Sequence, residues 1–352
     1  ADTTVFGGTY RIDLLSGWAK LILLPGTALA LLMARAEIAG KDREGSVYTL
    51  LCLVTLGALM LAGGGDMMLL VLGVVLTGLG SFALVAYPRD DAATEAGMKY
   101  LVFGAVTGSV MIYGVSFWFG GTGSTLFSEL GALDGKPIIA IAGLVAVIVG
   151  LGYKAALVPF HFWAPDAYDG APVSVAAYLS VITKIAAIFA FAQVLRDLPV
   201  STGWPLVVAL ISAATMTYGY LAAMNLGAFA VVMIAGRNLD DVIGFGRRRP
   251  VVGVAMVIFL LSLTGLPPLF GFVGKVYLLT AAVEAGFLWL AVIGILNSVL
   301  ALGVYLRIVV PMYRALDRDT DTARISPPLA VTLAVTVFVT LLMGLFAGVL
   351  PG

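Results

Sequence analysis

Residues 153–175 read YKAALVPFHFWAPDAYDGAPVSV. Lys154 stands near the end of an apolar run, a Pro-Phe-His-Phe-Trp stretch follows, and the next apolar run carries a second lone lysine, Lys184. An ammonium group is costly inside an apolar span, and a proline ends or kinks a helix. The stretch therefore predicts a membrane-crossing helix that breaks beside a buried charge.

The composition of the whole chain supports a membrane protein. Of the 352 residues, 61% are hydrophobic and only 11% are charged, with a mean hydropathy of +1.06, whereas soluble domains carry about a quarter charged residues. Hydrocarbon cannot satisfy free backbone groups, so spans within one chain of this kind are helices. We expect an all-α polytopic membrane protein that forms a single integral membrane domain over residues 1–352.

Ten apolar runs are long enough to cross a bilayer core of roughly 30 Å. They lie near residues 16–34, 47–64, 67–87, 97–119, 137–160, 173–195, 204–235, 251–283, 287–313 and 327–350. The uncharged run that starts at Trp204 would be about 50 Å long as one helix, so it should tilt, kink or contain a junction. The run at 251–283 contains Gly265, Pro267 and Pro268, which predict a second broken helix, and Lys275 follows within two turns.

The distribution of basic residues predicts the orientation of these spans. The odd-numbered connections hold eleven basic residues: Arg35, Lys41, Arg43, Arg89, Arg237, Arg247, Arg248, Arg249, Arg314, Arg318 and Arg324. The even-numbered connections and the termini hold three, Arg11, Lys136 and Arg196, with Lys20 at the start of the first helix. Because cytoplasmic loops are enriched in Lys and Arg, both termini should be non-cytoplasmic.

Several function classes are excluded by charge and cysteine content. Twenty basic and twenty acidic residues cancel, which gives no electrostatic reason to expect a nucleic-acid partner. Cys52 is the only cysteine, so the chain alone holds no disulfide framework and no iron–sulfur cluster. No cluster with metal-ligand spacing and no phosphate-binding loop is present, so we expect no cofactor and no metal in this chain. The chain starts at Ala1 with no signal-peptide pattern, and we expect a trimmed or incomplete N-terminus.

Three lysines are the candidate functional residues. Lys154, Lys184 and Lys275 lie well inside predicted spans, and intramembrane ionisable residues are functional hypotheses by default. The alternative is that each side chain reaches the interface or fills a polar cavity. That alternative is poor for Lys184, which has eleven helical residues on either side. Because burial makes an ammonium group release its proton more readily, the three lysines predict a hydrated proton path near mid-depth.

The polar residues after the first break are weaker candidates. His161 is the only histidine; its ordinary pKa suits proton relay, but a histidine at a helix end more often caps or donates a hydrogen bond. Asp166 and Asp169 are interpreted as caps of a Pro- and Gly-rich turn. We retain His161 as a proton-translocation candidate beside the lysines.

Long stretches of the chain resemble a known family. GLGYKAALVPFHFWAPDAYDGAPVSVAAYLSVITKIAAIFA, TEAGMKYLVFGAVTGSVMIYGVSFWFGGTGST, FLLSLTGLPPLFGFVGKVYLL and LAVIGILNSVLALGVYLRIVVPMY are similar to the antiporter-like subunit N of bacterial NADH-quinone oxidoreductase, respiratory complex I. Roughly residues 10–215 and 225–350 can be laid against this family. The resemblance implies a bacterial inner-membrane subunit that translocates protons. It also implies an inverted repeat whose halves span about 47–195 and 204–313 and relate the two broken helices.

The resemblance also implies roles and partners. The family's three central charges fall on Lys154, Lys184 and Lys275. Other membrane subunits and the lipid bilayer are the implied partners, and NAD, FMN, iron–sulfur clusters and quinone are expected in partner subunits. The chain departs from the family at two places. The family's glutamate on the span 67–87 is replaced by Leu76 and Thr77, and one or two spans are missing near 214–225. Two further spans are expected before the first one here.

Three readings of function stay open on the sequence. The first is a non-redox, proton-translocating subunit of complex I, a membrane part of a translocase with no redox active site of its own. The second is a subunit of a multi-subunit cation/proton antiporter or of a membrane-bound hydrogenase. The third is a non-conducting scaffold, which the missing glutamate favours. The subunit N-like stretches favour the first.

Overall fold

The computed structural model describes residues 3–219, 232–233, 242–314 and 325–345. The described part is almost entirely helical, as expected, and a short antiparallel hairpin at the start was not predicted. The hairpin pairs β1 (Thr3–Val5) with β2 (Tyr10–Ile12) around a 3-10 turn, Phe6–Gly8. The chain divides into two compact units, Ala1–Ile211 without Arg35–Glu37, and Ser212–Gly352.

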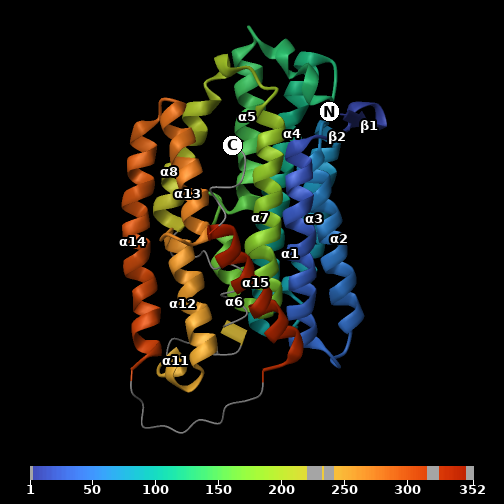
Figure 1. The fold of residues 1–352 in the computed structure, drawn as a ribbon. Helices are drawn as coiled ribbons and strands as arrows, with labels where there is room; N and C mark the ends of the chain where they lie inside the picture. Colours follow the sequence, from blue (N-terminus) through green and yellow to red (C-terminus); the bar gives the residue numbers. More distant parts are fainter. Residues whose placement is uncertain (1–2, 220–231, 234–241, 315–324, 346–352) are drawn as a thin grey trace. The chain divides into compact units, whose positions relative to one another are not determined.

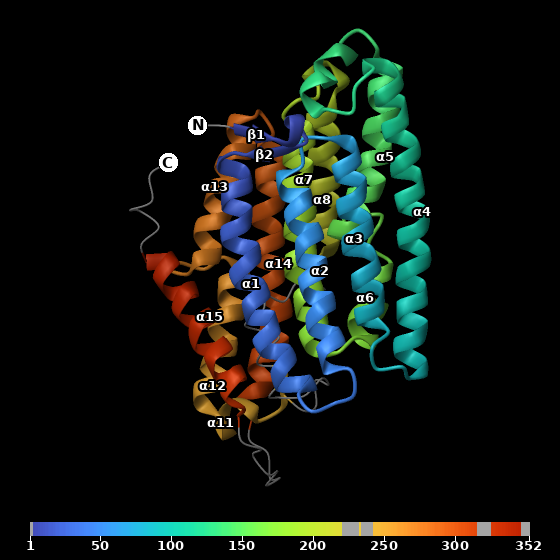
Figure 2. The same ribbon diagram turned by 90° about the vertical axis from the view of Figure 1, so that its right-hand side faces the viewer.

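The first unit holds the first six predicted spans. Its long helices are α1 (Leu14–Ile38), α2 (Glu44–Gly63), α3 (Met67–Val85), α4 (Asp91–Thr122), α5 (Pro137–Ala155) and α7 (Val173–Leu195). Shorter helical segments are Phe127–Leu133, α6 (Trp163–Gly170), Val200–Thr202 and the first part of α8 (Trp204–Gly219). Within this unit α2 packs on α3 and α7, and α4 packs on α3, α5 and α6. Figures 1 and 2 show these helices running side by side.

The second unit holds the remaining spans. Its helices beyond α8 are α11 (Phe245–Arg248), α12 (Pro250–Thr264), α13 (Phe270–Glu284), α14 (Leu288–Met312) and α15 (Pro327–Leu345). Here α12 packs on α13, α14 and α15, and α13 packs on α14 and α15. The predicted spans 204–235 and 327–350 extend beyond the described residues, as do Arg237, Arg318, Arg324 and most of the predicted junction near 214–225.

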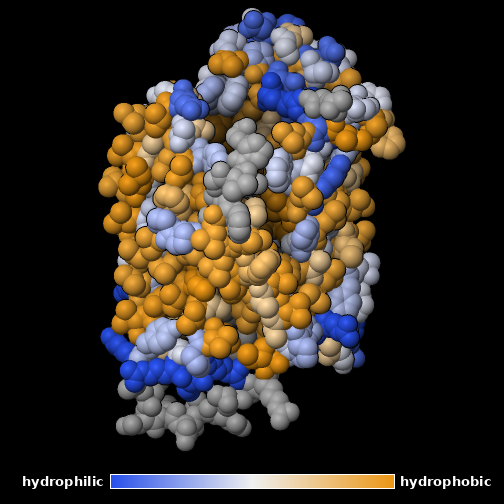
Figure 3. Space-filling view, in the orientation of Figure 1, coloured by the Kyte–Doolittle hydropathy of each residue, from blue (hydrophilic) through white to orange (hydrophobic). Residues whose placement is uncertain are grey.

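The helices have the length and surface of membrane spans. Within the described residues, seven helices are long and apolar enough to cross a bilayer, and three shorter apolar helices, Trp204–Thr215, Pro250–Thr264 and Pro327–Met343, accompany them. Large apolar side chains point outward along them, among them Leu72 and Leu79 of α3 and Val102 and Val106 of α4. Figure 3 shows hydrophobic residues over the helix flanks and hydrophilic residues near the helix ends. This is a multi-pass membrane protein, with a helix at each of the ten predicted spans.

Both predicted helix breaks are present, and they share one geometry. After α5, Ala156 is left-handed (φ 55°) and the Leu157 N–H donates to the Gly152 carbonyl at 2.8 Å. After α12, Gly265 is left-handed (φ 82°) and the Leu266 N–H donates to the Leu261 carbonyl at 3.2 Å. Such a bond satisfies a carbonyl that a helix end leaves free. The helix predicted over residues 137–160 therefore ends at Ala155. The span predicted over residues 251–283 consists of two helices, α12 and α13.

The segment after the first break differs from its prediction. Asp166 and Asp169 lie on helix α6 and not in a turn. Pro165 stands in the first turn of this helix, where its missing N–H costs no intrahelical bond. Asp166 also accepts a hydrogen bond from Lys99 of α4 at 2.8 Å, so it ties α6 to its neighbour.

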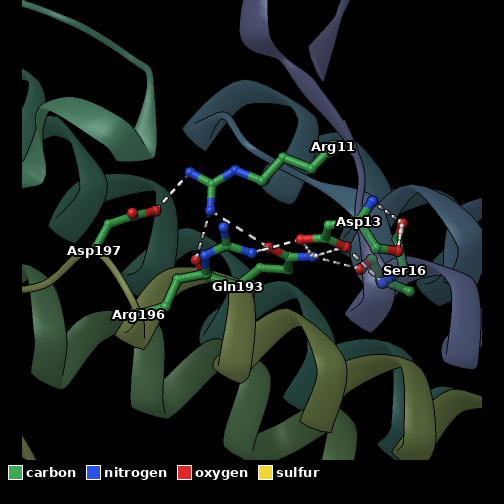
Figure 4. A network of polar contacts seen from close by, with 7 residues as sticks. Arg11, Asp13, Ser16, Gln193, Arg196 and Asp197 are labelled. Atoms are coloured by element: carbon green, nitrogen blue, oxygen red, sulfur yellow. Dashed lines mark hydrogen bonds and ion pairs between the residues drawn. The ribbon is translucent and has the colours of Figure 1, made fainter. Parts of the chain in front are cut away.

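A polar network holds the N-terminal hairpin to the end of α7 (Figure 4). Arg11 of β2 is 7% exposed, pairs with Asp197 and donates to Gln193, while Arg196 pairs with Asp13. Burial raises the pKa of Asp13, but hydrogen bonds from Ser16, Arg196 and Gln193 outweigh it and leave the pKa below its usual value. Paired charges tolerate partial burial, so this network fixes the start of α1 against α7.

Candidate functional site

Lys154 occupies the last turn of α5, directly before the first break. Its side chain is fully buried, and its Nζ donates a hydrogen bond to the Tyr100 hydroxyl of α4 at 3.3 Å. Across the described residues no carboxylate lies within ion-pair distance of Lys154. A buried ammonium group without a counter-ion is costly. The site therefore holds Lys154 with a neutral partner.

An aromatic cluster surrounds Lys154. The ring of Tyr100 stacks on Trp163 of α6 with centroids 4.2 Å apart, and it meets the edge of Phe82 of α3 at 4.7 Å. The Trp163 indole N–H donates to the Tyr153 carbonyl at 2.9 Å. That carbonyl is at the C-terminal end of α5, where helix carbonyls lack an intrahelical donor. The break in the helix thus brings Trp163 back onto the end of α5 and closes the cluster around Lys154.

Lys184 contacts the same cluster from α7. It stands at the centre of this unbroken helix and is partly buried. Its Nζ lies 5.4 Å from the ring centroid of Tyr168, and Tyr168 meets Trp163 edge-on at 6.0 Å. Among described residues Lys184 has no hydrogen-bond or ion-pair partner. Lys154 and Lys184 therefore flank one group of aromatic side chains, which the sequence analysis did not identify.

Lys275 lies at the second break, in the other unit. Its Nζ donates to the Thr264 carbonyl and to the Ser298 hydroxyl, both at 2.8 Å. Thr264 is the last residue of α12, and the negative end of a helix dipole attracts a cation. Two features favour glycine at position 265. Its φ is positive, and an added Cβ would lie 2.6 Å from the Lys275 side chain.

His161 lies between α5 and α6 and is 8% exposed. Its ring meets Phe162 with centroids 4.6 Å apart. The structure thus places His161 and Lys154 at one break and brings Lys154 and Lys184 to one cluster, while the roles of all four predicted residues stay predictions. Tyr100, Tyr168 and Trp163 were missed because their only sequence feature is an aromatic side chain in an apolar run.

The chain is similar to proteins of one family over most of its length. Residues 64–227 and 223–301 match the family described as NADH:quinone oxidoreductase/Mrp antiporter, TM. NADH-quinone oxidoreductase subunit N from Mycobacterium sp. (strain JLS) is 33% identical, with 89% of this chain and 77% of the relative covered. The protein of the same name from Parvibaculum lavamentivorans is 34% identical over the same shares.

This chain belongs to the NADH-quinone oxidoreductase subunit N family. The resemblance found in the sequence is thereby confirmed. The Mycobacterium alignment is 363 residues long, longer than this 352-residue chain, so the alignment contains positions that this chain lacks. The two segments that match the family overlap at residues 223–227. These residues lie outside the described part of the chain.

Solved structures agree with this family assignment. A chain of respiratory complex I from Thermus thermophilus is 27% identical and superposes with a TM-score of 0.81, covering 99% of this chain and 87% of that one. A chain of an archaeal membrane-bound sulfane sulfur reductase has a TM-score of 0.84 at 22% identity, with 96% of this chain and 80% of that chain covered; at that identity the likeness shows the fold alone. The subunit N family member thus has the fold of antiporter-like complex I subunits.

Proposed function

We propose that this subunit N family member is a proton-translocating, non-redox membrane subunit of an NADH-quinone oxidoreductase. The observation that carries the proposal is the fully buried Lys154 at a helix break, with Lys184 on the same aromatic cluster. An ionisable group inside a membrane is expensive and is retained for function by default. The names of its relatives and the complex I neighbour support the same assignment.

The three lysines supply the proton-carrying groups in this proposal. Lys154 and Lys184 exchange a proton across the aromatic cluster of the first unit, and Lys275 does so at the break of the second. Among the described residues, Lys154 contacts the Tyr100 hydroxyl and Lys184 the Tyr168 ring, while Lys275 donates to the Thr264 carbonyl and the Ser298 hydroxyl. Lysine, unlike arginine, is a cationic side chain that can release its proton in proteins, so each of the three can hold a proton and pass it on. His161, beside the first break, is the additional relay candidate.

The redox chemistry is placed in other subunits. Cys52 is the only thiol in the chain, and an iron–sulfur cluster takes several cysteine ligands. We therefore propose that NAD, FMN, iron–sulfur clusters and quinone bind to partner subunits, and that this chain contributes to the translocase by moving protons. Its proposed partners are the other membrane subunits of the complex.

Replacing Lys154 by methionine tests this function. Methionine keeps the length and packing of the side chain but holds no proton, so the complex should assemble and reduce quinone while fewer protons are taken up per quinone. The measurement is proton uptake by proteoliposomes holding the whole complex, normalised to quinone reduction. Lys136→Met is the matched control, because that lysine is exposed and bonds only the Gly121 carbonyl among described residues. Unchanged uptake in Lys154→Met would favour the scaffold reading.

The orientation in the bacterial inner membrane is proposed from the charge bias. Cysteines introduced near Arg248, beside α11, should react with an impermeant thiol reagent only from the cytoplasmic side. Those near Glu129, in the helical turn Phe127–Leu133, should react only from the opposite side. The reason is the excess of basic residues in the odd-numbered connections. Labelling of either position from both sides would refute the ten-span arrangement with both termini non-cytoplasmic.

A further inference from the structure

Lys154 and Tyr100 form a polar pair between two membrane spans of the first unit, α5 and α4. Both side chains are completely buried, and the Lys154 Nζ lies 3.3 Å from the Tyr100 hydroxyl and 5.5 Å from its ring centroid. No other hydrogen bond to Nζ occurs among the residues that the structure describes. The position of this one hydroxyl therefore determines where the lysine head group sits.

The hydroxyl of Tyr100 is fixed from three sides. Trp163 stacks on the ring and Phe82 meets it edge-on, while the Tyr153 hydroxyl donates to the Tyr100 backbone carbonyl at 2.7 Å. Side chains of α3, α5 and α6 thus hold the ring and the backbone of Tyr100, which keeps its hydroxyl next to Lys154.

The chemistry of a phenol suits a lysine that changes its charge. A tyrosine hydroxyl has one proton to donate and lone pairs to accept with. It accepts an N–H from the ammonium form of Lys154, and it can donate its O–H to the neutral amine. A carboxylate partner would instead be left as a buried unpaired anion whenever the lysine lost its proton, which is costly.

We propose that Tyr100 is the positioning residue of Lys154, a neutral partner that holds its amino group in both protonation states. The inference rests on the proposed proton-translocating function. It assigns to a tyrosine of α4 the task of keeping Nζ in the path while one proton is gained or lost at that nitrogen. The roles of Lys184 and Lys275 do not depend on it.

The test is Tyr100→Phe in the whole complex, which removes the hydroxyl and keeps the ring. Proton uptake per quinone reduced should fall to the level of Lys154→Met, with assembly unchanged. Tyr113→Phe is the matched control, since it removes a tyrosine hydroxyl of the same helix at an exposed position outside the cluster; it should keep the wild-type ratio. Wild-type uptake in Tyr100→Phe together with a loss in Lys154→Met overturns the inference alone. Wild-type uptake in Lys154→Met overturns the proposed function.

A second pair of variants separates the hydroxyl from the packing of the ring. Tyr100→para-aminophenylalanine returns a neutral hydrogen-bonding group to the same position and should restore part of the uptake lost in Tyr100→Phe, which a purely structural role of the ring would not allow. No rescue in an assembled complex counts against the inference. If Tyr100→Phe does not assemble, Tyr100→para-fluorophenylalanine replaces it, because fluorine fills the place of the hydroxyl but donates no proton; an unchanged uptake ratio there overturns the inference.

Discussion

A complex that carries Lys184→Met should assemble normally but move fewer protons for each quinone that it reduces. Lys184 stands at the centre of α7, with eleven helical residues on either side, so its ammonium group cannot easily reach an interface. A lysine at the centre of a span costs roughly 2.5–3.5 kcal/mol on insertion scales. The Tyr168 ring, 5.4 Å from Nζ, offsets about 2 kcal/mol of this cost. Methionine should therefore make the helix no less stable.

The measurement for Lys184 is proton uptake in proteoliposomes, normalised to quinone reduction. Lys184→Arg is the informative comparison, because a guanidinium keeps a positive charge but does not release its proton at physiological pH. We expect it to translocate little better than Lys184→Met. If the arginine variant instead pumps fully, a fixed charge is sufficient at this position. Full pumping by an assembled methionine variant would make Lys184 a structural residue and favour a scaffold.

The helices themselves were largely predictable from the apolar runs. Span 173–195 coincides with α7, because a charged or turn-forming residue bounds the apolar run at each end. Both breaks were also predictable, since prolines remove backbone donors that a continuous helix needs. The ends were less certain. The apolar run continues to Phe160, whereas α5 ends at Ala155. There Ala156 adopts a left-handed conformation, and the Trp163 indole N–H donates to the Tyr153 carbonyl.

The partners of the lysines were not predictable in the same way. Tyr100 is 54 residues from Lys154 along the chain. The spacing of apolar residues along α4 does not distinguish it from a tyrosine that only packs in a core. Arg11 is a second example. The sequence suggests only a basic residue in the N-terminal segment, yet its side chain is buried against Gln193 and Asp197. The cost of charge reveals which residues need a partner, but only tertiary packing decides which side chain supplies it.

The second large effect is expected from the contact between α4 and α5. Three pairs interlock along it, each placing a larger side chain of one helix on a small residue of the other: Met111 on Gly150, Ala146 on Gly114, and Trp118 on Gly143. The Trp118 indole also donates to the Ala140 carbonyl at 3.0 Å. Small residues let helix backbones approach closely in membranes. This contact holds Tyr100 of α4 and Lys154 of α5 within hydrogen-bond distance.

Gly114→Ala should destabilise the chain by about 1–3 kcal/mol, the usual cost of overpacking. The new methyl group would overlap with the Cβ of Ala146, which is attached directly to backbone and cannot rotate away, so the helices must separate. Gly108→Ala on the same helix is the control, because an added Cβ meets nothing there within 4 Å; it should stabilise by roughly 0.5–1 kcal/mol. The measurement is unfolding of the full chain by sodium dodecyl sulfate in mixed micelles, followed by circular dichroism. Equal stability of the two variants would mean that α4 and α5 are not packed this closely.

Since Lys154 depends on that contact for its partner, Gly114→Ala should also lower proton uptake per quinone, whereas Gly108→Ala should not.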